Sequence, residues 1–110
     1  MYIEQHSRYQ NKANNIQLRY DDKQFHTTVI KDVLLWIEHN LDQSLLLDDV
    51  ANKAGYTKWY FQRLFKKVTG VTLASYIRAR RLTKAAVELR LTKKTILEIA
   101  LKYQFDSQQS

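Results

Sequence analysis

The segment GYTKWYFQRLFKK, residues 55–67, concentrates side chains whose chemistry is binding rather than bond making. An indole, an amide and a guanidinium stand close together at Trp59, Gln62 and Arg63, with lysines around them. Guanidinium and amide groups can form paired hydrogen bonds to base edges, and an indole offers apolar area to a thymine methyl group. Ammonium groups attract phosphates, which fix position without reading sequence. These residue types therefore indicate recognition of a nucleic acid.

The spacing of the same segment divides one helix into two faces. One set of residues recurs at i, i+3, i+4 and i+7 and is expected to be buried: Phe61, Leu64, Phe65 and Val68. A second set follows the same rule on another face and is expected to be exposed: Trp59, Gln62, Arg63 and Lys66. We predict that Trp59, Gln62 and Arg63 read bases in a major groove. The predicted phosphate contacts are Thr57, Lys58, Lys66 and Lys67.

Each predicted base reader also has a plainer interpretation. Trp59 could be a partly buried core residue, Gln62 an ordinary surface residue, and Arg63 the partner of an acid, although no acid lies near it in sequence. The alternative function is a helical module that binds protein or RNA non-specifically through the basic Trp59 face. Sequence-selective duplex binding that depends on Trp59 and Arg63 would separate the two functions.

The helix 58–68 is the second half of a predicted helix-turn-helix unit. Ala51 is small enough for the two helices to approach, and Gly55, four residues later, permits the tight turn. Phe61, six residues further on, is placed to set the angle between the helices. Three matching positions make this a moderately specific pattern, which the neighbouring charges strengthen.

The chain as a whole predicts an all-α protein. Proline is absent and there are only two glycines, which favours helices joined by short turns. The expected helices run from a cap at Thr28 to about Leu41, over 47–54, 58–68 and 73–90, and from near Thr95. The long helix is apolar at Leu73, Ile77, Leu82, Ala85, Ala86 and Leu89. The expected divisions are a flexible polar leader 1–27, a first helix-turn-helix subdomain 28–72, a linker helix 73–91 and an incomplete second helix-turn-helix subdomain 92–110.

The excess of positive charge is confined to one stretch. The net charge is +7, yet no acidic residue lies between Asp49 and Glu88. Because a solvated helix face usually mixes both signs, we expect a one-sign patch of this kind to bind a polyanion. The nine basic residues of the stretch are Lys53, Lys58, Arg63, Lys66, Lys67, Arg78, Arg80, Arg81 and Lys84.

Other sites and locations are disfavoured by composition. The chain has no cysteine, no apolar run long enough to span a membrane and no signal-peptide pattern at its start, so we expect it in the cytoplasm. We predict no enzyme, no cofactor and no metal, because His6, His26 and His39 have no partnered serine or acid pattern. His39 is expected to serve the C-terminal end of a helix.

Two segments resemble a known family. TKWYFQRLF, 57–65, and YIRARRLTKAAVELR, 76–90, resemble the DNA-binding domain of AraC/XylS-type transcription activators, in the subgroup of MarA, SoxS and Rob. The resemblance covers about residues 28–110. It implies two helix-turn-helix units that read adjacent major grooves of an asymmetric double-stranded DNA site as a monomer. It also implies that Trp59, Gln62 and Arg63 read bases and that the bound activator engages RNA polymerase.

The second unit is visible as a weak internal repeat, with Ala100 lying 49 residues after Ala51. DSQQS, 106–110, would begin its recognition helix and place Gln108 and Gln109 at the DNA. Gln104 stands where the family has a turn glycine, so we expect positive φ there at a cost of about 1 kcal/mol. The chain stops about one turn into this helix, so either it is a fragment or its second unit is incomplete.

The first unit departs from the family at its start. Relatives usually carry a capping serine where this chain has Leu46. Loss of such a cap costs about 1 kcal/mol, and acids in the first turn, Asp48 and Asp49, recover part of it through the helix dipole.

Overall fold

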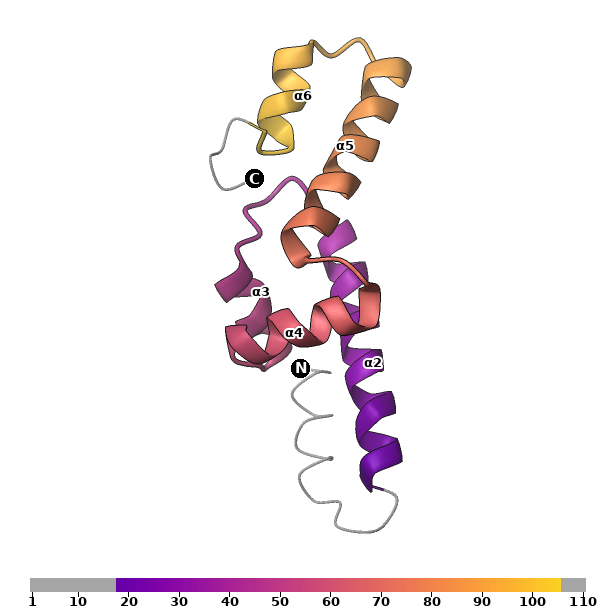
Figure 1. The fold of residues 1–110 in the computed structure, drawn as a ribbon. Helices are drawn as coiled ribbons and strands as arrows, with labels where there is room; N and C mark the ends of the chain where they lie inside the picture. Colours follow the sequence, from indigo (N-terminus) through magenta and orange to yellow (C-terminus); the bar gives the residue numbers. More distant parts are fainter. Residues whose placement is uncertain (1–17, 106–110) are drawn as a thin grey trace.

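The computed structural model describes residues 18–105, and every regular element in that range is a helix. The helices are α2 (Leu18–Glu38), α3 (Leu47–Ala54), α4 (Lys58–Thr69), α5 (Leu73–Leu91) and α6 (Ile96–Lys102). Short turns join α3 to α4, α4 to α5 and α5 to α6, and a longer loop, 39–46, joins α2 to α3 (Figure 1). The predicted all-α class is confirmed for these residues, and none of their helices is long and apolar enough to cross a membrane.

The prediction that the first helix begins at Thr28 is wrong, since α2 already starts at Leu18. Phe25 packs against the core from this added length, and His26 contacts two tyrosines further along the chain. Thr28 therefore lies inside the helix rather than at its cap. The polar composition around it hid a helix that tertiary contacts support.

The turn between α3 and α4 is formed as its residues predict. Gly55 has φ 88°, and the backbone N–H of Tyr56 donates to the carbonyl of Ala51 at 3.0 Å, which closes the end of α3. Thr57 then caps α4 by accepting a hydrogen bond from the N–H of Tyr60 at 3.3 Å. Gly70, with φ 86°, ends α4.

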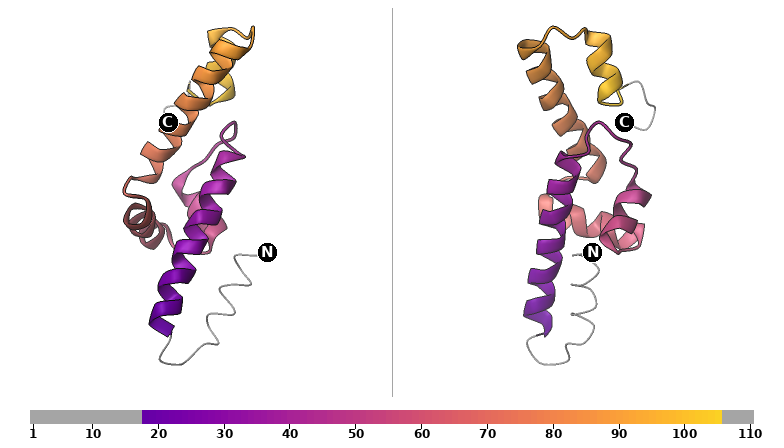
Figure 2. Two further views of the ribbon diagram at one scale, coloured as in Figure 1. Left: turned by 90° about the vertical axis from the view of Figure 1, so that its right-hand side faces the viewer. Right: turned by 180° about the vertical axis from the view of Figure 1, so that it is seen from behind.

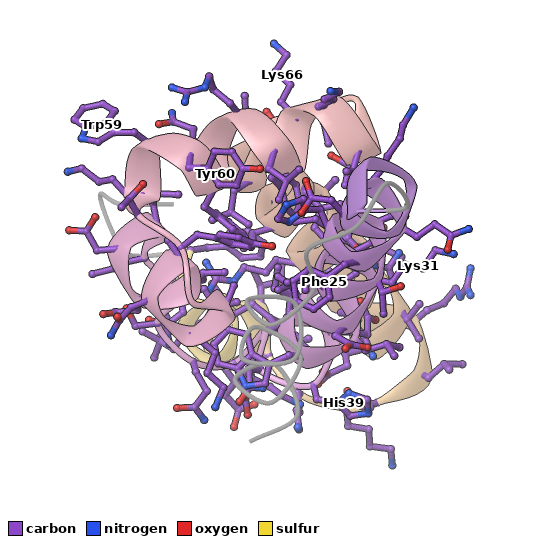
Figure 3. The ribbon with its side chains drawn as sticks, turned by 90° about the horizontal axis from the view of Figure 1, so that it is seen from below. Phe25, Lys31, His39, Trp59, Tyr60 and Lys66 are labelled. Carbon is purple, nitrogen blue, oxygen red and sulfur yellow. The ribbon has the colours of Figure 1, made fainter. Side chains whose placement is uncertain are left out.

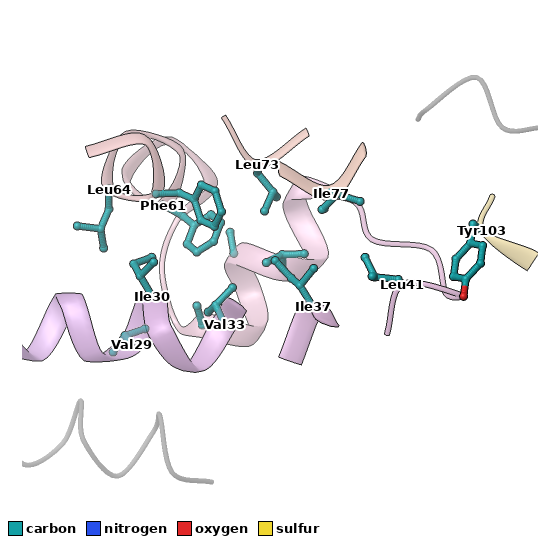
Figure 4. Close-up of a cluster of buried hydrophobic side chains, with 14 of the residues drawn as sticks. Val29, Ile30, Val33, Ile37, Leu41, Phe61, Leu64, Leu73, Ile77 and Tyr103 are labelled. Atoms are coloured by element: carbon teal, nitrogen blue, oxygen red, sulfur yellow. The ribbon is translucent and has the colours of Figure 1, made fainter. Parts of the chain in front are cut away.

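One hydrophobic core joins α2, α3, α4 and the start of α5 (Figure 4). Phe61 and Phe65 are fully buried, with ring centroids 5.8 Å apart, and Leu64 is buried beside them. The predicted inner face of α4 is thus confirmed, with Val68 half-buried at its edge. The other buried members are Val29, Ile30, Val33, Ile37, Leu41, Val50, Ala51, Ala54, Leu73 and Ile77, and the same cluster continues along α5 and α6 with Ala85, Ile99 and Tyr103.

Helix α5 leaves this core and continues alongside α6, as both views in Figure 2 show. Its buried stripe is Leu73, Ile77, Arg81 and Ala85. Leu82, Ala86 and Leu89 do not belong to it, because all three are exposed, Leu82 at 55% and Leu89 at 47%. Their apolar character suggested a buried face, but the helix turns that face away from α2 and α6.

Helix α6 begins as predicted, directly after Thr95. Thr95 caps it in a reciprocal arrangement: its hydroxyl accepts from the N–H of Glu98 at 3.1 Å, and the Glu98 carboxylate accepts from the N–H of Thr95 at 2.7 Å. Gln104 adopts φ 68° in the turn that follows, which confirms the expected positive φ. Its side-chain amide donates to the carbonyl of Asp42 at 3.2 Å and so connects this turn to the loop after α2.

Candidate nucleic-acid interface

The outer face of α4 is exposed over its whole length. Trp59 is 66% exposed, and Gln62, Arg63 and Lys66 are exposed one and two turns further on. Figure 3 shows Trp59 and Lys66 projecting from the α4 ribbon away from the other helices. The alternative of Trp59 as a core residue is therefore wrong. One rigid helix presents an indole, an amide and a guanidinium to solvent.

The predicted phosphate contacts flank this face. The Lys58 ammonium lies 3.6 Å from an Asp48 carboxylate oxygen and 5.2 Å from the centroid of the Trp59 ring. Both contacts are at the surface, where such interactions are weak and exchange easily. Lys66 and Lys67 are exposed in the last turn of α4. Thr57 uses its hydroxyl oxygen as the cap acceptor, so its O–H remains able to donate to a phosphate.

The prediction that the whole basic stretch forms one polyanion surface is wrong for three of its members. The Arg80 guanidinium donates two hydrogen bonds of 2.9 Å to the Glu38 carboxylate, and the Lys84 ammonium lies 3.4 Å from the same group. Hydrogen bonds from Arg80 first, and from Lys84, lower the pKa of Glu38 to about 2. These two charges hold α5 against α2.

Arg81 is the third basic residue with a structural role. Only 5% of it is exposed, and its guanidinium donates to the carbonyls of Leu41 at 3.0 Å and Gln43 at 2.6 Å. Burial lowers the pKa of this guanidinium, and the two carbonyls compensate for part of the lost hydration. The loop after α2 is thereby fixed to the middle of α5.

An equivalent polar connection joins α6 to α5, and sequence reasoning missed it. The Glu88 carboxylate accepts from the Lys102 ammonium at 2.8 Å and from the Tyr103 hydroxyl, and Lys94 lies 3.4 Å away. Hydrogen bonds from Lys102 first, and then from Tyr103, lower the pKa of Glu88 to about 2. Glu88 and Lys102 are 14 residues apart, whereas neighbours on one helix face are three or four residues apart. No local pattern in the sequence therefore indicates this contact.

Sequence reasoning also missed a cluster around His26. Its imidazole Nδ1 lies 2.5 Å from the Tyr56 hydroxyl, and its Nε2 lies 3.4 Å from the Tyr60 hydroxyl and 3.1 Å from the Asp22 carboxylate. Tyr60 directly follows Trp59, so this cluster links the early part of α2 to the first turn of α4. His39 instead places its Nδ1 2.8 Å from the carbonyl of Leu35, as expected for a side chain at a helix C-terminus.

The predicted readers of the second unit, Gln108 and Gln109, lie outside the described residues.

Comparison with known proteins agrees with this geometry. A family model described as a helix-turn-helix domain matches residues 50–110, which is more than half of the chain. The chain is 98% identical over its 110 residues to the transposon Tn10 TetD protein of Escherichia coli and covers 80% of that protein. It is also 51% identical over 85 residues to the regulatory protein SoxS of Escherichia coli, with 77% of this chain and 79% of SoxS covered.

The chain belongs to the AraC-type helix-turn-helix family. The predicted resemblance is thus confirmed, and the protein is a DNA-binding transcription regulator rather than an enzyme. A further relative is the HTH-type transcriptional activator AarP of Providencia stuartii, 50% identical over 99 residues, with 88% of this chain and 73% of AarP covered.

Proposed function

We propose that this AraC-type regulator activates transcription by reading a specific double-stranded DNA sequence through α4 in the major groove. The observation that carries the proposal is the exposed face of α4, where Trp59, Gln62 and Arg63 lie on the side opposite the buried Phe61 and Phe65. A helix held by a packed core can place three different side chains at fixed positions in a groove.

Each side chain of this face has a role that its chemistry supports. Arg63 forms a bidentate pair with guanine, Gln62 pairs with adenine, and Trp59 contacts a thymine methyl group. Thr57, Lys58, Lys66 and Lys67 hold the backbone on either side of the groove. The hydrogen bonds made by Thr57 within the protein fix the start of α4, so the same residue orients the helix and contacts a phosphate.

The second unit begins with α6 and extends the site into the next major groove, with Gln108 and Gln109 at its bases. Because α5 connects the two units within one chain, a monomer reads an asymmetric site. AarP, a relative named as a transcriptional activator, supports activation as the outcome. RNA polymerase is the protein partner in this proposal, because an activator acts on the polymerase at the promoter. Cytoplasmic location follows from this role.

Selection of bound sequences from a random duplex pool tests this function. Variants at Arg63 then test whether that residue reads a base. Arg63→Ala should cost roughly 1 to 3 kcal/mol on the selected site and relax the choice of one base pair. Arg63→Lys is the matched control: it keeps the charge but loses the bidentate fork, so it should lose the same base discrimination.

Lys66→Ala should instead weaken selected and random duplexes alike and reduce the slope of log affinity against log salt by about 0.9. If the wild-type protein selects no sequence, or if Arg63→Ala and Lys66→Ala have equal effects on both duplexes, the base-reading proposal fails. Non-specific binding of RNA or protein through the Trp59 face would then be the better description.

A further inference from the structure

We propose that the early part of α2 forms a phosphate seat beside the recognition helix, with Lys23 and Lys67 as its two cationic walls. The inference rests on the proposed reading of DNA by α4 and extends the contact to a helix outside the helix-turn-helix unit. The occupant is a backbone phosphate on the outer flank of the site, beyond the groove that α4 reads.

The seat is a pocket of about 490 Å³ between α2 and α4. Lys23, His26 and Thr27 line it from α2, and Tyr60 and Lys67 line it from α4. Both lysines are exposed, so their ammonium groups are able to reach an entering anion. Two ammonium groups supplied by different helices are suited to a phosphodiester, because its negative charge is shared by two non-bridging oxygens and each can accept from one ammonium.

The His26 cluster holds the two walls together. Hydrogen-bonding distances of 2.5 Å to the Tyr56 hydroxyl and 3.4 Å to the Tyr60 hydroxyl connect His26 to the turn and to α4. Asp22 is the acid of the pocket, and its carboxylate lies 3.1 Å from the His26 ring. The two lysines of the pocket outweigh this one negative charge. Lys23 stands less than one helical turn before His26, so its position relative to α4 is set by the same contacts.

The position of the seat determines which phosphate it meets. Helix α2 continues past α4 on the side opposite α6 (Figure 1), so a DNA strand leaving the α4 groove in that direction passes over its early turns. The contact therefore lengthens the protein footprint away from the second unit. A helix-turn-helix unit alone, formed by α3 and α4, would lack it.

The first test removes one charge at a time from the full chain. Lys23→Gln should lower affinity for the selected duplex and for a random duplex by the same severalfold ratio, and reduce the salt slope by about 0.9. Lys31→Gln is the matched control, because Lys31 is exposed on the same helix but is not part of the pocket and points to a different side from Lys66 (Figure 3). Lys31→Gln should leave the affinity and the salt slope unchanged. Both variants should have the same melting temperature.

The second test locates the phosphate. Neutral methylphosphonates replace the flanking phosphates of the selected duplex one by one, and affinity is measured with wild-type protein and with Lys23→Gln. Replacement of one phosphate on the outer flank should weaken wild-type binding severalfold and leave binding by Lys23→Gln unaffected. Equal sensitivity of the two proteins at every phosphate would overturn the inference, as would an unchanged salt slope in Lys23→Gln. Either result leaves the proposed function standing if Arg63→Ala still relaxes base choice, whereas loss of sequence selection by the wild type would refute that function itself.

Discussion

The two halves of the described chain start from the same pattern and are stabilised differently. Val50 and Ile99, 49 residues apart, are both buried, and Gly55 and Gln104 at the same separation both adopt positive φ. Ala54 and Tyr103, at the same separation, are also both buried. Other positions of the two helices differ. Leu47 is packed against the core, whereas Ile96, its counterpart, is 74% exposed, and Leu97 and Leu101 are 67% and 51% exposed.

The difference shows what a recognition helix contributes to its own unit. In the first unit α4 supplies Phe61, Leu64 and Phe65, which close the core over α2 and α3. In the part of the second unit that the structure describes, α6 rests on α5 through Ile99 and Tyr103 and through the polar contacts of Glu88. Burial of many large apolar side chains stabilises the first unit, while the described part of the second is held by a much smaller buried contact together with hydrogen bonds and ion pairs.

Phe61→Ala should have the largest effect and break the first unit. Removal of a fully buried phenyl ring leaves a cavity and typically costs about 3 to 5 kcal/mol, a large part of the stability of a small domain. Denaturant unfolding followed by helical circular dichroism measures it. Leu97→Ala, at a 67% exposed position of α6, is the control and should stay within about 0.5 kcal/mol of wild type. Similar losses from the two variants would contradict the contrast between the units.

Acid should loosen the second unit through Glu88. Its pKa is lowered to about 2 from an ordinary 4.5, so its carboxylate stabilises the folded state fully above about pH 4.5 and loses that contribution as pH falls toward 2. Glu88→Gln should reproduce the loss at neutral pH, by roughly 1 kcal/mol for hydrogen bonds at a partly exposed site. Hydrogen exchange of α6 amides measures the effect.

Glu38→Gln serves as the control for Glu88→Gln. Its carboxylate titrates in the same pH range but joins α2 to α5, so it should leave the exchange of α6 amides nearly unchanged. Equal acceleration of α6 exchange in the two variants would show that Glu88 does not hold α6 specifically.

The smallest expected effect concerns helix caps, in which the two units again differ. Leu46 gives α3 no side-chain cap, whereas Thr95 gives α6 a reciprocal one. Leu46→Ser should therefore raise stability by about 0.5 kcal/mol, less than a full cap because Leu46 gives up some apolar contact. Thr95→Ala should lower it by about 1 kcal/mol. The melting temperatures of the two variants measure these effects. An unchanged or lower melting temperature for Leu46→Ser would contradict a start of α3 directly after Leu46.

Local signals predicted most of the fold. Gly55, Thr57 and Thr95 act through backbone φ and caps within three or four residues, so the limits of α3 and α4 and the start of α6 could be read from the chain. The start of α2 could not, because its support comes from Tyr56 and Tyr60, about thirty residues away. The roles of Arg80 and Arg81 were equally hidden, since Glu38 and Leu41 lie about forty residues before them.

The sequence by itself determined the helices and the two faces of α4, because periodicity and residue type decide which side of a helix avoids water. The tertiary structure alone decided which positive charges remain for a phosphate: Arg80, Arg81 and Lys84 are committed to α2 and its loop, while Lys66 and Lys67 stay exposed. The physical reason is that an ion pair depends on the distance between two side chains in space. That distance is settled only when the helices pack.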